Sequence, residues 1–250
     1  DIAVWSANPN LTTCPAGLRD CRLWLDSSDR CTITLGAGGV AEWRSKGVSI
    51  HRALQGTVSE QPSYVTASGS LINGRPYIRC VSGDIMYVSD IGGDTPISTI
   101  SDTDYTEVVV FRTSSANGTM MVVTDSPSFG AGAFDRWIAV SGGNVQHYNY
   151  NGLGTETLVT PGTYTDSLPH IAISSTSASS PHKLWVDGTL IASGVDTFSG
   201  FNWKTNIVIG GHYALGYYED DILEVMYFDY VLSNEERKLL ETYMTKKWGI

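Results

Sequence analysis

The sequence predicts an all-β protein in which two antiparallel sheets pack face to face and one C-terminal helix covers them. Three observations support this fold class. Short runs of alternating apolar and polar residues recur along most of the 250 residues, and turn-forming residues separate these runs. Only residues 233–250 carry apolar side chains at helical spacing. The spacing of about a dozen strands is typical of a β-sandwich.

The composition describes a globular chain with an acidic surface. Hydrophobic residues make up 42% and charged residues 17%, and the formal net charge is -10. Such a charge argues against nucleic acid and anionic membranes as partners, because nothing neutralises their phosphates. No apolar run is long enough to span a bilayer, so we expect no membrane insertion. A neutral ligand, a cation or another protein is the expected partner.

The first 22 residues are irregular, because Pro9, Pro15 and Gly17 interrupt every run. We therefore expect residues 1–22 to form an N-terminal extension, packed on the domain or linking it to a preceding one. Residues 23–250 show no repeat and no change of composition, and we predict that they form one domain.

The four cysteines lack the Cys-x-x-Cys spacing of thiolate zinc sites. Cys14 and Cys21 bracket the loop CPAGLRDC, and they are disulfide candidates if the compartment is oxidising. Cys80 occupies an apolar position in PYIRCV, where we expect a buried free thiol.

Turn residues mark where the predicted strands end and where two of them form hairpins. Asp187-Gly188 joins two short alternating runs and is the strongest hairpin signal in the chain, and Gly142-Gly143 joins two more. GAGG at 36–39 precedes a strand and not a helix, so it predicts a turn and not a phosphate-binding loop. The predicted strands lie in LWLD, CTITLG, GGVAEWRS, PSYVTAS, PYIRCV, DIMYVSD, YTEVVVFRTS, GTMMVVTDS, RWIAVSGGNVQHYNY, HIAISST, HKLWVDGTLIASG, NIVIGG and DILEVMYFDYVL.

The C-terminal segment SNEERKLLETYMTKKWGI predicts an amphipathic helix. Ser233 is the expected N-cap, and Glu236 completes a capping box with it. Lys246 and Lys247 suit the negative end of the helix dipole, and Gly249 is a typical C-cap. We expect this helix to cover an edge or end of the sandwich.

Six motifs occur in an order that resembles the concanavalin A-like lectin/glucanase superfamily, in its laminin-G-like branch. The resemblance covers residues 23–250, and the motifs are LWLDSSD, GGVAEWRSKG, QPSYV, INGRPYIRC, LWVDG and DDILEVMYFDYVLSNEERKLLETYMTKKWGI. It implies a two-sheet antiparallel jelly-roll sandwich with one concave face. Similar modules are frequent in phage and bacterial surface proteins, as adhesion or carbohydrate-binding units and as structural pieces of virions.

The resemblance therefore implies a non-enzymatic recognition or adhesion module of a virion or cell-surface protein. A glycan, a surface receptor or neighbouring subunits are the expected partners, and the virion surface or the cell exterior is the expected location. A purely structural or decoration domain of a phage particle is the alternative. A glucanase-type glycoside hydrolase is the second alternative.

The stretch HYALGYYEDDILEVM raises the hydrolase alternative, because its carboxylates resemble the catalytic row of retaining glucanases. Glu219 and Asp221 share one face of a regular strand, whereas Glu224 points to the other face unless a bulge intervenes. The laminin-G resemblance already explains Asp221 and Glu224 as positions that belong to the fold. We therefore expect no catalytic residue here, and no Gly-x-Ser-x-Gly motif points to another nucleophile.

Aromatic side chains suggest where a glycan binds, because aromatic rings stack on sugar rings while polar tips bond to hydroxyls. The alternative is that these side chains only pack over sheet edges. One candidate patch flanks the acidic stretch and the other lies in QHYNYNG; their members are Trp203, His212, Tyr213, Tyr217 and Tyr218, and Tyr148 and Tyr150.

A calcium ion is the cofactor that family analogy allows. Hard cations bind carboxylate and carbonyl oxygens, which SDTDY and YEDD supply through Asp102, Asp104 and Asp220. Neither loop matches an EF-hand, and solvated acidic loops are the more common case.

Overall fold

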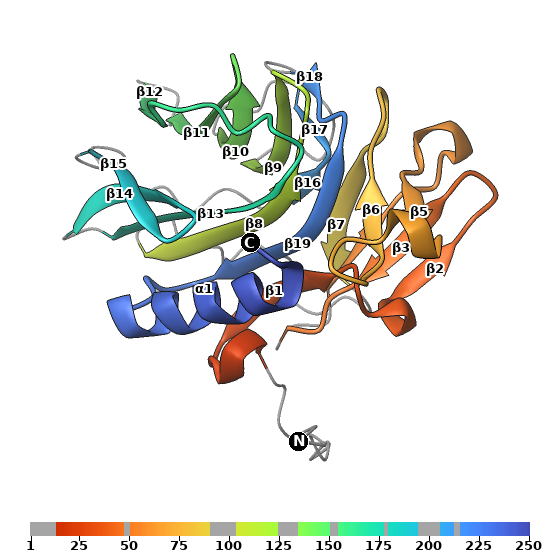
Figure 1. The fold of residues 1–250 in the computed structure, drawn as a ribbon, viewed down its shortest axis with the longest axis horizontal. Helices are drawn as coiled ribbons and strands as arrows, with labels where there is room; N and C mark the ends of the chain where they lie inside the picture. Colours follow the sequence, from red (N-terminus) through yellow and green to blue (C-terminus); the bar gives the residue numbers. More distant parts are fainter. Residues whose placement is uncertain are drawn as a thin grey trace.

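The computed structural model describes residues 14–47, 51–90, 104–124, 135–150, 155–177, 180–194, 206–212 and 216–250. It confirms the predicted fold class, since two antiparallel sheets pack face to face and one helix covers the outer face of one of them (Figure 1).

The first sheet has eight strands among the described residues, and its long central strands are β8 and β19. In spatial order the strands are β15 (Thr189–Gly194), β14 (Ser180–Val186), β13 (Pro169–Ser177), β8 (Tyr105–Arg112), β19 (Asp221–Phe228), β6 (Tyr77–Arg79) and β5 (Ser63–Val65), with β1 (Cys21–Asp26) paired to β19.

The second sheet has eleven strands in the same described ranges. Nine follow the order β12 (Thr155–Val159), β11 (Asn144–Tyr150), β10 (Asp135–Ser141), β9 (Gly118–Thr124), β16 (Asn206–Ile209), β7 (Met86–Asp90), β4 (His51–Leu54), β3 (Val40–Arg44) and β2 (Ile33–Leu35). The short strands β17 (Gly211–His212) and β18 (Gly216–Tyr217) pair with each other, and β18 also pairs with β9. Four 3-10 turns are η1 (Pro15–Gly17), η2 (Arg30–Thr32), η3 (Val58–Glu60) and η4 (Ser68–Ser70).

The main core lies between the sheets, and a second core lies between the first sheet and the helix. Val109 and Phe111 of β8 point into the main core, whereas Val108 and Val110 point toward the helix. Because β8 is buried on both faces, its sequence is a nearly continuous apolar run and shows no alternation.

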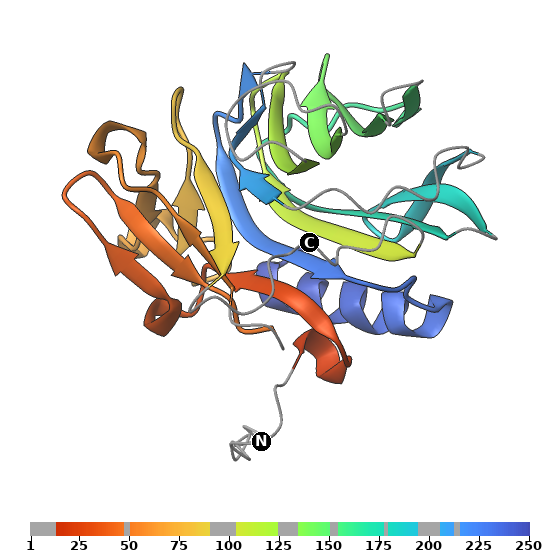
Figure 2. The same ribbon diagram turned by 180° about the vertical axis from the view of Figure 1, so that it is seen from behind.

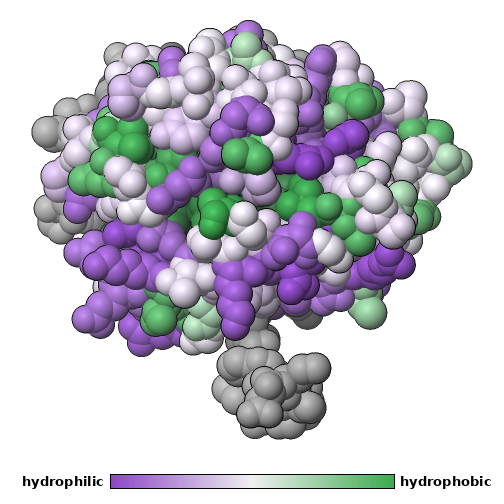
Figure 3. All heavy atoms as spheres, viewed as in Figure 1, coloured by the Kyte–Doolittle hydropathy of each residue, from purple (hydrophilic) through white to green (hydrophobic). Residues whose placement is uncertain are grey.

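Helix α1 (Asn234–Trp248) closes the second core as predicted. Figures 1 and 2 show it lying across the outer face of the first sheet beside β1 and β19. The Ser233–Glu236 capping box is present, and Gly249 ends the helix with φ 77°. Leu240, Met244 and Trp248 pack against the sheet. The outward face of the helix is mainly hydrophilic (Figure 3), and no helix of the described residues is long and apolar enough to cross a membrane.

Both predicted hairpins are confirmed. Val186 pairs with Thr189 across Asp187 and Gly188, whose φ angles of 49° and 79° define the left-handed turn that Asp-Gly favours. Ser141 pairs with Asn144 across two glycines that also have positive φ.

Residues 14–22 pack on the domain. Cys14, Leu18 and Cys21 are buried in the core beneath α1, and β1 begins at Cys21. Whether residues 1–22 are an extension of the domain or a linker stays a prediction. Residues 1–13 lie outside the described residues.

Candidate functional site

Aromatic side chains gather on the outer face of the second sheet. Val122 and Trp137 pack in this group, whereas their chain neighbours Val123 and Ile138 point into the main core. Successive side chains of a strand point to opposite faces, so the group lies on the face turned away from the first sheet. Its aromatic members, which we call the aromatic patch, are Trp137, Tyr148, His212, Tyr217 and Tyr87.

Trp137 is the centre of the aromatic patch. It lies directly across the β10–β11 pair from Tyr148. The two rings stack with their centroids 3.7 Å apart and 14° between their planes. The His212 ring, from β17, lies 4.7 Å from the indole at 33°. Trp137 is 6% exposed and His212 3%, whereas Tyr148, Tyr217 and Tyr87 are half-buried. The tyrosine rings therefore offer the accessible surface, and the indole supports them.

The indole N–H of Trp137 is buried and has no hydrogen-bond partner among the described residues. Leaving a buried donor without an acceptor costs about 1–3 kcal/mol. Such a group is an exception that asks for an explanation, and a ligand oxygen or a bound water would satisfy it. The patch thus combines partly exposed tyrosine rings with a buried donor that has no partner among the described residues, and sugar binding uses ring surface and hydrogen-bond donors together.

The structure joins the two patches that the sequence suggested. Tyr148 from one and His212 and Tyr217 from the other meet around Trp137, which the sequence analysis missed. The sequence contained the information that places Trp137 in this group. A two-residue turn at Gly142–Gly143 sets the register of the hairpin, and this register puts Trp137 opposite Tyr148. Trp203 and Tyr213 lie outside the described residues, as does the side chain of Tyr150.

Tyr218 does not belong to the aromatic patch, and this corrects the sequence prediction. It is 0% exposed and packs in the main core, where its hydroxyl donates to the Arg112 carbonyl at 2.9 Å. Tyr217 and Tyr218 are adjacent residues in extended backbone, so one side chain faces outward and the other inward.

The carboxylates of the acidic stretch do not meet in an open groove. Glu219 is exposed. Asp221 is 1% exposed and accepts hydrogen bonds from the Nε atoms of Arg79 and Arg112, both at 2.7 Å. Glu224 is 0% exposed and lies beneath α1. Two carboxylates in separate buried sites cannot act together on one glycosidic bond.

Glu224 holds the helix to the sheet. Its two oxygens accept hydrogen bonds from the indole N–H groups of Trp24 at 2.9 Å and Trp248 at 2.8 Å, and Lys247 forms an ion pair with it. Burial, and then the nearby Asp26, raises the pKa of Glu224. A register shift between Ile222 and Glu224 is the bulge that turns this carboxylate toward the helix.

The described members of the predicted calcium set do not come together. The Asp220 carboxylate accepts hydrogen bonds from the Thr113 hydroxyl at 2.9 Å and from the backbone N–H groups of Ser114 and Ser115 at 2.6 and 3.1 Å. It therefore orders the loop after β8. Asp104 is exposed, and Asp102 lies outside the described residues. Within the described ranges no three acidic, His or Cys side chains form a metal-binding group.

Cys14 and Cys21 lie together as two unbonded thiols. The Cys21 N–H donates to the Cys14 sulfur at 3.0 Å. The hydrogen bond from the Cys21 thiol lowers the pKa of Cys14 to about 7, while burial raises the pKa of Cys21. The disulfide between them stays a prediction. Cys80 is buried with a free thiol, as expected.

The fold is similar to solved receptor-binding domains of botulinum neurotoxins. The domain of the C/D mosaic serotype has 13% sequence identity and a TM-score of 0.59, covering 91% of this chain and 51% of that chain. The serotype D ligand-binding domain in complex with N-acetylneuraminic acid has 13% identity and a TM-score of 0.54, covering 89% of this chain and 50% of that chain. A mouse laminin α1 chain with domains LG4-5 has 13% identity and a TM-score of 0.46, covering 60% and 40%.

This chain spans about half the length of the toxin domains that it matches. At this identity the similarity shows a shared fold alone, a two-sheet antiparallel sandwich, which agrees with the architecture that the sequence predicted. No family model matches the sequence, and no curated protein sequence matches it significantly.

Proposed function

We propose that this chain is a non-enzymatic binding module that recognises a glycan through the aromatic patch. The observation that carries the proposal is the Trp137–Tyr148 stack on the outer face of a sheet, with an unbonded indole N–H beneath partly exposed tyrosines. Sugar rings stack on aromatic faces through their C–H groups, and the N–H supplies a donor for a hydroxyl.

The toxin domains support the same class of function by analogy. One of them was solved in complex with N-acetylneuraminic acid, and the fold it shares with this chain is compatible with sugar binding. The proposed setting, a virion or cell-surface protein that uses the module for recognition or adhesion, rests on the laminin-G-like resemblance of the sequence. The proposed partner is therefore a glycan on a receptor or on a neighbouring surface.

A glycan array with the full chain tests this proposal. We expect a set of related glycans to bind, and Tyr148→Ala to weaken that binding by about fivefold or more, since truncating an aromatic residue that anchors a ligand costs more than about 1 kcal/mol. Tyr64→Ala is the matched control, because Tyr64 is also half-buried but lies on β5 of the other sheet.

Two results would count against the proposal. If no glycan binds, the structural or decoration role gains support and the recognition role fails. If Tyr64→Ala weakens binding as much as Tyr148→Ala, the glycan is held elsewhere. Circular dichroism of both variants identifies a loss of binding that comes only from unfolding.

A further inference from the structure

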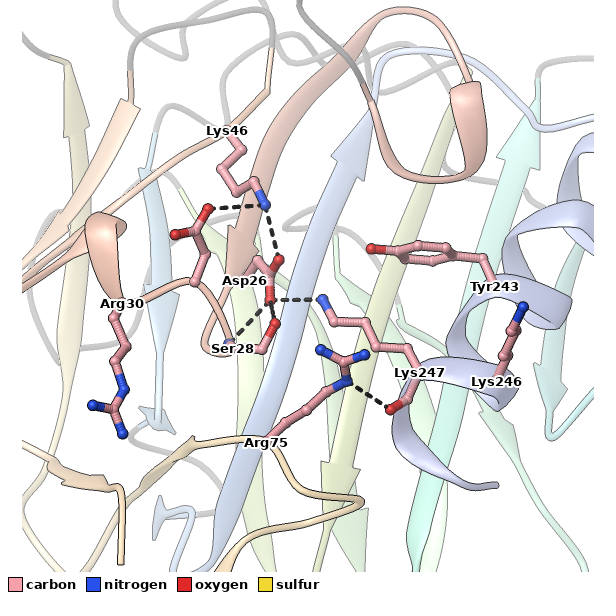
Figure 4. A pocket seen from close by; sticks show the side chains of 9 residues that line it. Asp26, Ser28, Arg30, Lys46, Arg75, Tyr243, Lys246 and Lys247 are labelled. Carbon is pink, nitrogen blue, oxygen red and sulfur yellow. Dashed lines mark hydrogen bonds and ion pairs between the residues drawn. The ribbon is translucent and has the colours of Figure 1, made fainter. Parts of the chain in front are cut away.

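A cavity of about 650 Å³ lies where the loop after β1 meets the C-terminal end of α1. It is on the helix side of the first sheet, whereas the aromatic patch lies on the outer face of the second sheet. Its volume is in the range of small-molecule sites. The lining residues are Asp26, Ser28, Asp29, Arg30, Lys46, Arg75, Tyr243, Lys246 and Lys247 (Figure 4).

The charge of this cavity opposes the charge of the molecule. Five lysine or arginine side chains and two aspartates line it, although the chain as a whole carries 26 acidic and 16 basic residues. Nearly a third of the basic residues therefore surround one cavity. A concentration of cations on an otherwise acidic protein favours an anionic ligand at that place and at few others.

Both inner lysines are already paired with carboxylates. Lys46 pairs with Asp26 at 3.0 Å and with Asp29 at 3.1 Å, and Lys247 pairs with Asp26 at 2.7 Å. Lys247 also pairs with Glu224, which lies behind it and is fully buried. Burial opposes the charge of Asp26, but the two lysines outweigh it and hold its pKa below the usual value.

The outer cations have no carboxylate partner in the described part of the chain. Arg30 and Lys246 are exposed, and Arg75 donates only its Nε–H, to the Lys247 carbonyl at 3.0 Å. Figure 4 shows Arg30 and Lys246 on opposite sides of the cavity in this view, with Arg75 between them. Arg75 thus keeps its terminal N–H groups, the pair that binds oxyanions in bidentate geometry.

Tyr243 adds a ring and a hydroxyl to the cavity. Its ring is half-buried, and its hydroxyl points across the cavity toward the side where Lys46 and Asp26 lie (Figure 4). A carboxylate carries one negative charge, whereas a phosphate monoester carries about two near pH 7. Three cationic side chains that have no carboxylate partner match a phosphate monoester better than a carboxylate. The volume of the cavity leaves room for an organic group beside the phosphate.

We propose that this cavity binds a small phosphate monoester, with Arg75 on the phosphate, Arg30 or Lys246 reaching it from the rim, and Tyr243 against its polar organic group. The site is independent of the glycan proposed for the aromatic patch. The cations come from four separate segments of the chain, so this site has no local sequence motif of the kind that a phosphate-binding loop has.

Isothermal titration calorimetry at constant ionic strength tests this site with four probes: glucose 6-phosphate, inorganic phosphate, gluconate and glucose. We expect glucose 6-phosphate to bind saturably and more tightly than inorganic phosphate, and gluconate and glucose to bind least. Equal binding of gluconate and glucose 6-phosphate would contradict the preference for two charges. Equal binding of inorganic phosphate would contradict the ester, and no binding of any phosphate would overturn the site.

The double variant Arg30→Gln/Lys246→Gln removes two rim cations from exposed positions. It should weaken glucose 6-phosphate binding by about tenfold or more, because charge-assisted hydrogen bonds are strong. The matched control Arg19→Gln/Lys238→Gln makes the same charge change at exposed positions outside the cavity, one of them on the same helix. Equal losses in both variants would show general charge attraction and refute the site. Tyr148→Ala should leave phosphate binding unchanged, which separates this test from that of the glycan.

Discussion

Trp137 and Trp24 show how two equally buried indoles can have different roles. Both are 6% exposed. The Trp24 N–H donates to Glu224 at 2.9 Å, whereas the Trp137 N–H has no partner in the described part of the chain. The first indole therefore belongs to the polar network under α1. The second has an indole N–H that is not used by the described residues and lies in the proposed glycan site.

Replacing each indole by phenylalanine separates these roles. Trp24→Phe should lower the free energy of unfolding by about 1.5–3 kcal/mol more than Trp137→Phe, because it removes a hydrogen bond to a buried carboxylate. Trp137→Phe should instead weaken glycan binding. Urea denaturation measures the first effect and the glycan array the second. Equal destabilisation by the two changes would contradict the assignment of the N–H groups.

The sequence could predict part of the site at this scale. It named Tyr148, His212 and Tyr217, which the structure brings together in the aromatic patch, because aromatic residues near glycine-rich turns can be recognised in the sequence; their role in binding stays a prediction. It assigned Tyr218 wrongly, since the composition of a stretch does not tell which of two adjacent side chains points inward. Trp137 was missed because RWIAV reads as an ordinary strand until the hairpin register is worked out.

Strands β8, β10 and β11 are linked by a buried ionic cluster that crosses between the two sheets. Glu107 of β8 pairs with Arg136 of β10, and its other oxygen lies 3.0 Å from His147 Nε2 of β11. Burial, followed by the nearby His182 ring, lowers the pKa of His147 from 6.5 to about 4. The His182 ring meets that of His147 edge-on, with their centroids 4.4 Å apart, and its own partner is Glu156.

This cluster predicts acid sensitivity. The unfolded chain binds a proton at His147 below about pH 6.5, whereas the folded chain resists protonation until about pH 4, so stability falls as the pH drops through this window. His147→Gln should flatten this part of the plot of melting temperature against pH. His170 is the control of opposite sign: burial lowers its pKa, but Asp187 and Asp166 raise it overall. In the wild type, protonated His170 stabilises the fold at low pH, and this contribution is lost as the pH rises. His170→Gln should therefore lower the stability at low pH and remove this dependence on pH. An unchanged acid slope in His147→Gln would contradict the account.

Elements with strong local signals were predictable, and elements set by distant partners were not. The helix, with its capping box and terminal glycine, and the Asp-Gly hairpin follow from nearby residues alone. Short strands such as β17 and β18 do not, because two residues carry no periodicity and form a strand only where a neighbouring strand offers its edge. The structure has nineteen strands in its described residues, where the sequence predicted about a dozen.

At the scale of the whole molecule, we propose that residues 14–22 belong to the folded domain. Cys14 and Leu18 fill the core beneath α1, and Cys21 pairs with Phe228. Residues 14–250 should therefore unfold at a higher temperature than residues 23–250. The difference in free energy of unfolding should be about 2 kcal/mol or more, the amount that burial of one large apolar side chain contributes. Equal melting temperatures of the two fragments would show that residues 14–22 do not stabilise the domain, as expected for a boundary at residue 22.

Net charge is a second property of the whole molecule, and it gives no indication of the cation-lined cavity at the C-terminal end of α1. A formal charge of -10 argued against phosphate-bearing partners in general, and for most of the surface that argument stands. Folding nevertheless brings five basic residues from four segments to one place. An average over the sequence cannot show such a concentration, because it depends on which loops the topology brings together.

A crystal structure with the best glycan from the array would show directly whether the aromatic patch is the binding site. We predict a sugar ring against Tyr148 and Tyr217 on the outer face of the second sheet, with one sugar oxygen within hydrogen-bond distance of the Trp137 indole nitrogen. A glycan bound elsewhere, or one that leaves the indole N–H unbonded, would contradict it.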